Sequence, residues 1–140
     1  MKKIITFSTL CLIGVASLSA ITLDDFFTKC KSFKNAEYRN VPNHKFQSRY
    51  DGISSIEVVE VEDYSRKVRK QVNELVGQIK LNKEELILKS SEDDDKMRMY
   101  LENNGDNSLL YIIEYDNDEC EIIKAKGSAD ALLKFARHND

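Results

Sequence analysis

The sequence is poor in several residue types on which common active sites depend. It has no tryptophan, one proline, five glycines and two histidines among its 140 residues. It contains no His-Glu-x-x-His motif, no glycine-rich phosphate loop, no Cys-x-x-Cys pair and no Gly-x-Ser-x-Gly turn. His138 lies two residues from the C-terminus, where chains usually fray. The sequence therefore gives little support for catalysis. The exception is a set of glutamates on one strand, Glu57, Glu60 and Glu62, which could face a cleft as the paired acids of glycosidases do.

Long hydrophobic runs are also scarce, and the one marked run stands at the N-terminus. MKK, the apolar stretch IITFSTLCLIGVA and the small residues SLSA form the pattern of a secretory signal peptide. We expect cleavage after Ala20; cleavage after Ser19 and retention as an anchor are the alternatives. The stretch is shorter than the roughly 20 residues of a membrane span. Cys11 lacks a lipobox-like run before it, so lipid anchoring is not expected.

Positive charge is in short supply in the remaining chain, residues 21–140, whose length fits one domain. The signal peptide removes Lys2 and Lys3, which leaves 19 basic against 24 acidic residues and moves the net charge from −3 to −5. Nucleic-acid binding requires a basic surface, so no nucleic-acid partner is expected. No later segment is apolar enough to be a transmembrane span after processing.

Only two cysteines, Cys30 and Cys120, follow the signal peptide. An oxidising compartment permits a disulfide between them, which would close a long loop and contribute about 4 kcal/mol. The alternative is two free buried cysteines that behave as small hydrophobic residues. Their spacing alone leaves both interpretations open.

The first half of the mature chain predicts two helices and two strands. Thr22 and Asp25 form a capping box for a helix over 23–34, with Cys30 on its buried side. A short strand precedes Pro42, and a second strand spans 54–62, with a bulge at the Val58-Val59 pair. Asp63 is the expected N-cap of the clearest amphipathic helix, over 64–80, whose apolar stripe is Tyr64, Val68, Val72, Leu75, Val76 and Ile79.

The second half predicts a meander of four antiparallel strands. In the third strand from the end, Met97, Met99 and Leu101 alternate with polar residues, so one face is expected to be buried and Tyr100 to face solvent. LLYIIEY predicts a central strand covered on both faces. Ser128 caps a last helix that carries Ala129, Leu132, Leu133 and Ala136 inward. The expected strands lie near 84–90, 96–102, 109–115 and 120–127.

Together these elements predict an α+β fold, a two-layer sandwich with an antiparallel sheet and about three helices. The order of strands and turns in ELILKSSEDDDKMRMYLENNGDNSLLYIIEYDNDECEIIKAKGSADALLKF, together with SIEVVEVEDYSRKVRKQVNEL and the N-terminal pattern, resembles a group of small exported Bacteroidota proteins known only as domains of unknown function. The strongest shared motif is the strand that ends at Gly127 before a short helix. This resemblance implies an envelope or secreted location and carries no catalytic residues.

Two surfaces are candidates for binding a protein partner. The segment YRNVPNHKFQSRY combines arginines with aromatic residues, as interface anchors do; its candidate residues are Tyr38, Arg39, His44, Phe46, Arg49 and Tyr50. The alternative is an ordinary loop that packs Phe46 and Tyr50 inward. The polar side of the long helix offers the basic residues Arg66, Arg69 and Lys70, or is an ordinary charged helix face.

Two acidic turns at the same expected end of the sheet are candidates for weak binding of a divalent cation, through Asp94, Asp95, Asp116 and Asp118. The alternative is solvated hairpin turns, because Asp and Asn tolerate turn conformations. The sequence therefore predicts an exported periplasmic or envelope module that binds a protein partner and needs no cofactor. The alternatives are a cation-binding protein or a small hydrolase that uses the acidic turns.

Overall fold

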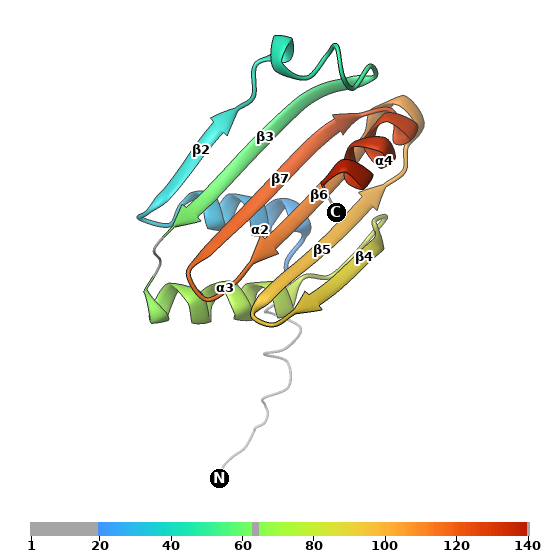
Figure 1. The fold of residues 1–140 in the computed structure, drawn as a ribbon. Coiled ribbons are helices and arrows are strands. Elements are labelled where there is room, and N and C mark those ends of the chain that lie inside the picture. Colours follow the sequence, from blue (N-terminus) through green and yellow to red (C-terminus); the bar gives the residue numbers. More distant parts are fainter. Residues whose placement is uncertain (1–19, 63–64, 140) are drawn as a thin grey trace.

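The protein is built on one six-stranded antiparallel sheet, seen in a computed structural model that describes residues 20–62 and 65–139 (Figure 1). The strands stand in the order β2-β3-β7-β6-β5-β4, so the last four form a meander and β3 joins its β7 edge. The sequence pattern did not fix this order. The strand bounds are β2 Ala36–Asn40, β3 Ile53–Glu62, β4 Glu85–Glu92, β5 Asp95–Glu102, β6 Ser108–Tyr115 and β7 Glu119–Gly127.

Helices cover both faces of the sheet. The helices α2 (Leu23–Lys31) and α3 (Arg66–Gln78) pack on one face, and α4 (Ala129–His138) packs on the other (Figure 1). Alternate residues of β3 show the division, because Val59 and Val61 join the core under α2 and α3, while Ile56 and Val58 join the core under α4. α4 covers only part of its face (Figure 1).

The predicted α+β class, the antiparallel sheet, the C-terminal meander and the three helices are confirmed for the described residues. The capping box of Thr22 and Asp25 is present, and the Ser128 side chain accepts a hydrogen bond from the Ala131 amide at the start of α4. β6 is buried on both faces, as its continuous apolar pattern indicated. Where two layers were expected, however, the helices are divided between the two faces.

Several local predictions were wrong. The irregularity in β3 lies between Ile53 and Ser55 and not at Val58-Val59. The two valines are both apolar because Val58 packs in the core on one face of the sheet and Val59 in the core on the other. Tyr100 is buried, since α3 and α2 cover the face expected to be wet. In α4, Ala129 and Leu133 were predicted to be buried but are only partly buried. The buried residues of this helix are Ala131, Leu132, Phe135 and Ala136.

The cap of α3 also differs from the expectation. Ser65 is its N-cap, with the side chain accepting a hydrogen bond from the Val68 amide at 3.3 Å. The predicted cap Asp63 and the stripe residue Tyr64 lie outside the described residues.

The last turn of α4 is tied to the core through His138. Nδ1 of His138 lies 2.9 Å from the Tyr50 hydroxyl, and the Tyr50 ring packs edge-on against Phe135. The segment before β3 thus closes the core under α4. Among the described residues, no helix is both long and apolar enough to traverse a membrane.

Candidate functional site

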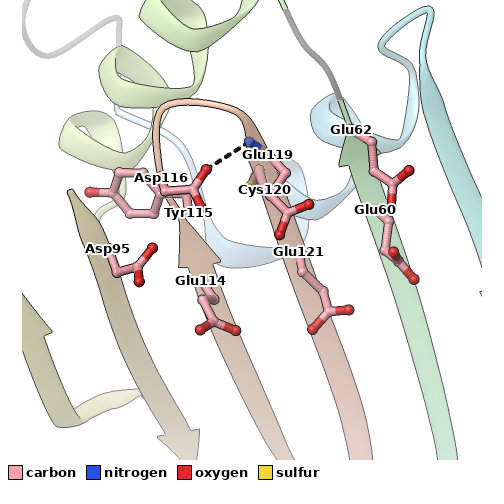
Figure 2. A pocket seen from close by; sticks show the side chains of 9 residues that line it. All are labelled: Glu60, Glu62, Asp95, Glu114, Tyr115, Asp116, Glu119, Cys120 and Glu121. Atoms are coloured by element: carbon pink, nitrogen blue, oxygen red, sulfur yellow. Dashed lines mark hydrogen bonds between the residues drawn. The ribbon is translucent and has the colours of Figure 1, made fainter. Parts of the chain in front are cut away.

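The most distinctive surface is the part of the sheet that α4 leaves open. It is a hollow of about 250 Å³ whose lining includes seven carboxylates, which we call the acidic face. They come from four neighbouring strands and one turn (Figure 2). The acidic face consists of Glu60, Glu62, Asp95, Glu114, Asp116, Glu119 and Glu121.

The register of the strands aligns these carboxylates. Glu60 of β3 is paired with Glu121 of β7, which is paired in turn with Glu114 of β6. On the other side of Glu60 stands Glu37 of β2, so four glutamates form one row across four strands. Paired residues project from the same face of a sheet and lie close together. Glu62 and Glu119 form a second pair nearer the end of the sheet.

The sequence alternation explains why the row faces the open side. Val59 and Val61 flank Glu60 and are fully buried under α2 and α3, so Glu60 must project from the opposite face. The same argument holds for Glu121, which stands between the buried residues Cys120 and Ile122. Burying one side of β3 and β7 therefore gathers their glutamates on the other side.

The two acidic turns continue this surface. The β4–β5 turn and the β6–β7 turn lie side by side around a second hollow of about 310 Å³. Asp93 adopts a left-handed backbone conformation with φ of 55°, which Asp tolerates. The Asp116 carboxylate accepts a hydrogen bond from the Asp118 amide at 2.7 Å. It accepts another from the Glu119 amide at 2.8 Å (Figure 2). Turn chemistry thus accounts for the identity of these acids.

The carboxylates of the acidic face raise one another's pKa. The pKa of Glu121 is raised first by partial burial and then by the charges of Glu60 and Glu114. Partial removal from water likewise raises the pKa of Glu119 and of Asp95, and Asp116 adds the largest charge effect at both. The fold therefore stabilises protons on this surface.

A single guanidinium offsets part of this charge. Arg39 of β2 forms an ion pair with Glu60, and its charge lowers the pKa of Glu121. The Arg39 side chain is 58% exposed, so this pair is open to solvent. Neither Arg39–Glu60 nor Lys124–Asp24, the ion pairs seen among the described residues, involves the basic residues of α3.

The predicted metal ligands meet in space without forming a metal centre. Asp94, Asp95, Asp116 and Asp118 all line the hollow between the two turns, as expected from the meander. However, no group of three or more His, Cys, Asp or Glu side chains in residues 20–62 and 65–139 is arranged to hold a metal ion. What the turns supply is a concentrated negative potential.

The segment first considered as a binding surface is split between core and solvent. Phe46 and Tyr50 are 3% and 8% exposed and belong to the core under α4, so neither is available as a surface anchor. The alternative prediction, in which Phe46 and Tyr50 pack into the core, is therefore confirmed for these two residues. Tyr38 donates a hydrogen bond to Glu57 on the face of α2, and Arg39 turns to the acidic face, while His44 and Arg49 are exposed.

The basic residues of α3 form a separate surface. Arg66 and Lys70 are exposed and Arg69 is partly buried, on the face of the sheet opposite the acidic face. The structure therefore does not join them to the 38–50 segment.

The sequence patterns do not predict the acidic face as one surface. They indicate Glu60 and Glu62 only as possible paired acids with Glu57, and Asp95 and Asp116 only as possible cation ligands. Glu57 lies on the other face, where Tyr38 binds it. The sequence does contain a pattern that indicates this face. In β3 and again in β7, glutamates alternate with apolar residues that are buried on the opposite face. Recognising the row also required the pairing of β3 with β7.

Comparisons with known proteins add no relative. Scans against family models, curated proteins and solved structures found no match to this chain. The resemblance to exported Bacteroidota proteins therefore stays an expectation from the sequence.

Proposed function

We propose that the protein is an exported envelope or periplasmic binding module that holds a cationic segment of a protein partner on its acidic face. The observation that carries this proposal is the row of glutamates formed by Glu37, Glu60, Glu121 and Glu114 on an open sheet surface.

Like charges in directly opposed positions oppose folding. Such cross-strand pairs are destabilising by a few tenths of a kcal/mol to about 1 kcal/mol each. The protein repeats this arrangement at Glu37–Glu60, Glu60–Glu121, Glu114–Glu121 and Glu62–Glu119. A partner that brings lysine or arginine side chains to the row relieves the repulsion and gains charge complementarity. The same potential accelerates the encounter with a cationic partner.

The surroundings of the row favour an extended protein segment. Met97 is the cross-strand partner of Glu114, and Ile123 follows Glu121 on the same face; both are only partly buried. They place apolar surface between the acidic face and the core under α4. A segment with basic residues beside an apolar one would contact both.

The N-terminal pattern supports the location of this function. Residues 1–20 read as a signal peptide, and the fold of the described residues begins directly after it, with the capping box at Thr22. The expected partner is therefore another protein of the envelope.

The binding test uses a fluorescent synthetic Lys/Ser peptide and the full chain, with affinity read by anisotropy. The double variant Glu114→Gln/Glu121→Gln should weaken binding about tenfold, for two charge contacts worth roughly 0.7 kcal/mol each. Raising the ionic strength should weaken binding to the unmodified protein as well.

The matched control is Glu74→Gln/Glu85→Gln, which removes the same charge from exposed positions of α3 and β4. It should leave the affinity unchanged within about twofold. An equal loss in both double variants would mean that only net charge matters, and absence of binding at low salt would refute the proposal.

The alternative cation function rests on the two adjacent acidic turns, and the same assay separates it. If millimolar calcium raises the melting temperature and Asp94→Asn abolishes the effect, the turns bind the cation. If calcium only weakens peptide binding and Asp94→Asn changes nothing, the ion acts by screening.

A further inference from the structure

Cys30 and Cys120 meet in the core behind the acidic face, although roughly 90 residues separate them in the sequence. Cys30 is the buried residue near the end of α2, and Cys120 is the second residue of β7. Their exposed fractions are 0% and 1%, and the structure carries both as free thiols. Both residues belong to the same core cluster, where the Cys30 and Cys120 side chains interact with each other.

A second contact also joins α2 to β7. At the start of α2, Asp24 accepts a 2.7 Å hydrogen bond from Nζ of Lys124. Six helical residues from Asp24 to Cys30 span about 9 Å. Four strand residues from Lys124 to Cys120 span about 13 Å. The ion pair and the cysteine pair therefore link α2 to β7 at two points about 9 Å apart along the helix.

We propose that Cys30 and Cys120 are a redox modification site, and that in an oxidising compartment they form a disulfide that fastens α2 to β7. This inference rests on the proposed export of the chain and does not depend on the proposed cationic partner. Two interacting thiols buried in one core are the starting arrangement for a disulfide, which forms when the two Cα atoms lie within about 7 Å of each other. Exported proteins are those in which such bonds persist.

The oxidant is a disulfide of an exchange partner, either a small molecule or a protein. One cysteine thiolate attacks this disulfide, forms a mixed disulfide and releases one thiol of the partner. The second cysteine thiolate then attacks the protein sulfur of the mixed disulfide, forms the Cys30–Cys120 bond and releases the second thiol. Two protein thiols are thereby oxidised and one partner disulfide is reduced, with their two protons transferred to the two released thiols.

Burial sets when this exchange takes place. The hydrogen bond to Cys30 and the apolar surroundings raise the pKa of Cys120 well above its usual value, so its reactive thiolate is disfavoured in the folded chain. A partner disulfide also cannot reach sulfur atoms that are about fully buried. Oxidation therefore precedes the docking of α2, or follows its transient release from the sheet.

The test uses the full chain with Cys11→Ser, so that only the two core cysteines report. The denatured, reduced protein is refolded with a mixture of reduced and oxidised glutathione, then alkylated under denaturing conditions and digested. We expect no alkylated thiol and one linked peptide that joins Cys30 to Cys120. The oxidised protein should melt on the order of 10 °C above the same protein reduced, because the bond closes a long loop.

Two results would overturn the proposal. One is full alkylation of both cysteines after refolding to the native circular dichroism spectrum in the oxidising mixture. The other is a linked protein that melts at or below the temperature of the reduced form. If the denatured chain does not refold, folded reduced protein is incubated with oxidised glutathione near its melting temperature. The same linked peptide is expected there, and its absence would equally count against the bond.

Discussion

Glu60 and Glu121 face each other as directly paired residues of β3 and β7, in the hollow that α4 leaves open among the described residues (Figure 2). Arg39 reaches Glu60 from the edge strand, whereas Glu121 has Glu114 as its neighbour on the other side. Glu121 thus stands between two glutamates, whose charges both raise its pKa. The stability of the protein should respond to this residue in a way that depends on charge and not on packing.

Replacing Glu121 by glutamine should stabilise the protein. Glutamine keeps the size and hydrogen-bonding ability of the side chain and removes the charge that opposes Glu60 and Glu114. We expect the free energy of unfolding to rise by about 0.5 kcal/mol, the scale of cross-strand charge pairs. Urea unfolding measures the change, with the exposed Glu85→Gln as a control expected to have little effect. A loss of stability in Glu121→Gln alone would show that this carboxylate has a favourable structural role.

The acidic face should also make the protein more stable as the pH falls towards the carboxylate range. The pKa values of Asp95, Glu119 and Glu121 are raised in the folded chain, from ordinary values of 3.8 for Asp and 4.5 for Glu. Between the ordinary and the raised pKa, the folded state binds more protons than the unfolded state. Stability from these groups therefore increases as pH falls through the raised pKa and is lost as pH rises through it.

Urea unfolding at several pH values between about 7 and 4.5 tests this linkage. Other carboxylates titrate over the same range, so the informative quantity is the difference between the unmodified chain and Glu119→Gln/Glu121→Gln. The stabilising advantage of the double variant should shrink as the pH is lowered. A constant difference across the range would contradict the proton linkage of these two residues.

The course of the chain was predictable because each element carries its own local signal. Period-two patterns in 84–127 and the turn residues between them predicted β4 to β7, and capping residues located α2 and α4. Local patterns do not report which face a partner element will cover. This is why Tyr100 was expected in solvent and lies under the helices of the α2 face instead.

The candidate site was less predictable for a related reason. The acidic turns are continuous in sequence and can be predicted from it, and Glu114 meets Glu121 across the local β6–β7 hairpin. Glu60 joins these two residues only through the non-local pairing of β3 with β7. Conversely, the aromatic residues of the 38–50 segment resembled interface anchors because aromatic residues serve both cores and interfaces. Nothing local in the sequence separates these two uses.

The placement of Phe46 in the core gives a prediction opposite to that of a surface anchor. Phe46→Ala should lower the free energy of unfolding by about 3 kcal/mol or more, because it empties space between α4 and the sheet. Arg49→Ala, three residues away and exposed, should change stability by less than about 0.5 kcal/mol. Thermal unfolding of the two variants decides the matter, and an unchanged melting temperature for Phe46→Ala would place that side chain at the surface.

The close approach of Gly127 to Gly52 can be tested by adding one methyl group at Gly127. Gly127 ends β7 where the chain passes Gly52, and a Cβ atom at Gly127 would lie 2.3 Å from the Gly52 carbonyl oxygen and 2.8 Å from the Ile53 Cα. Both neighbours are backbone atoms, so relief requires the strand to move. That Gly52 oxygen also accepts a 2.9 Å hydrogen bond from the amide of Ser128, the N-cap of α4.

Gly127→Ala should therefore lower the free energy of unfolding by roughly 1–3 kcal/mol, the cost of overpacking a close contact. Gly77→Ala is the matched change in the exposed part of α3, where an added Cβ meets no atom within 4 Å. There alanine should raise stability by about 0.5–1 kcal/mol, since it favours the helix more than glycine does. Opposite signs for one added methyl group would show that Gly127 is required by the approach of β7 to Gly52, whereas equal effects would contradict that contact.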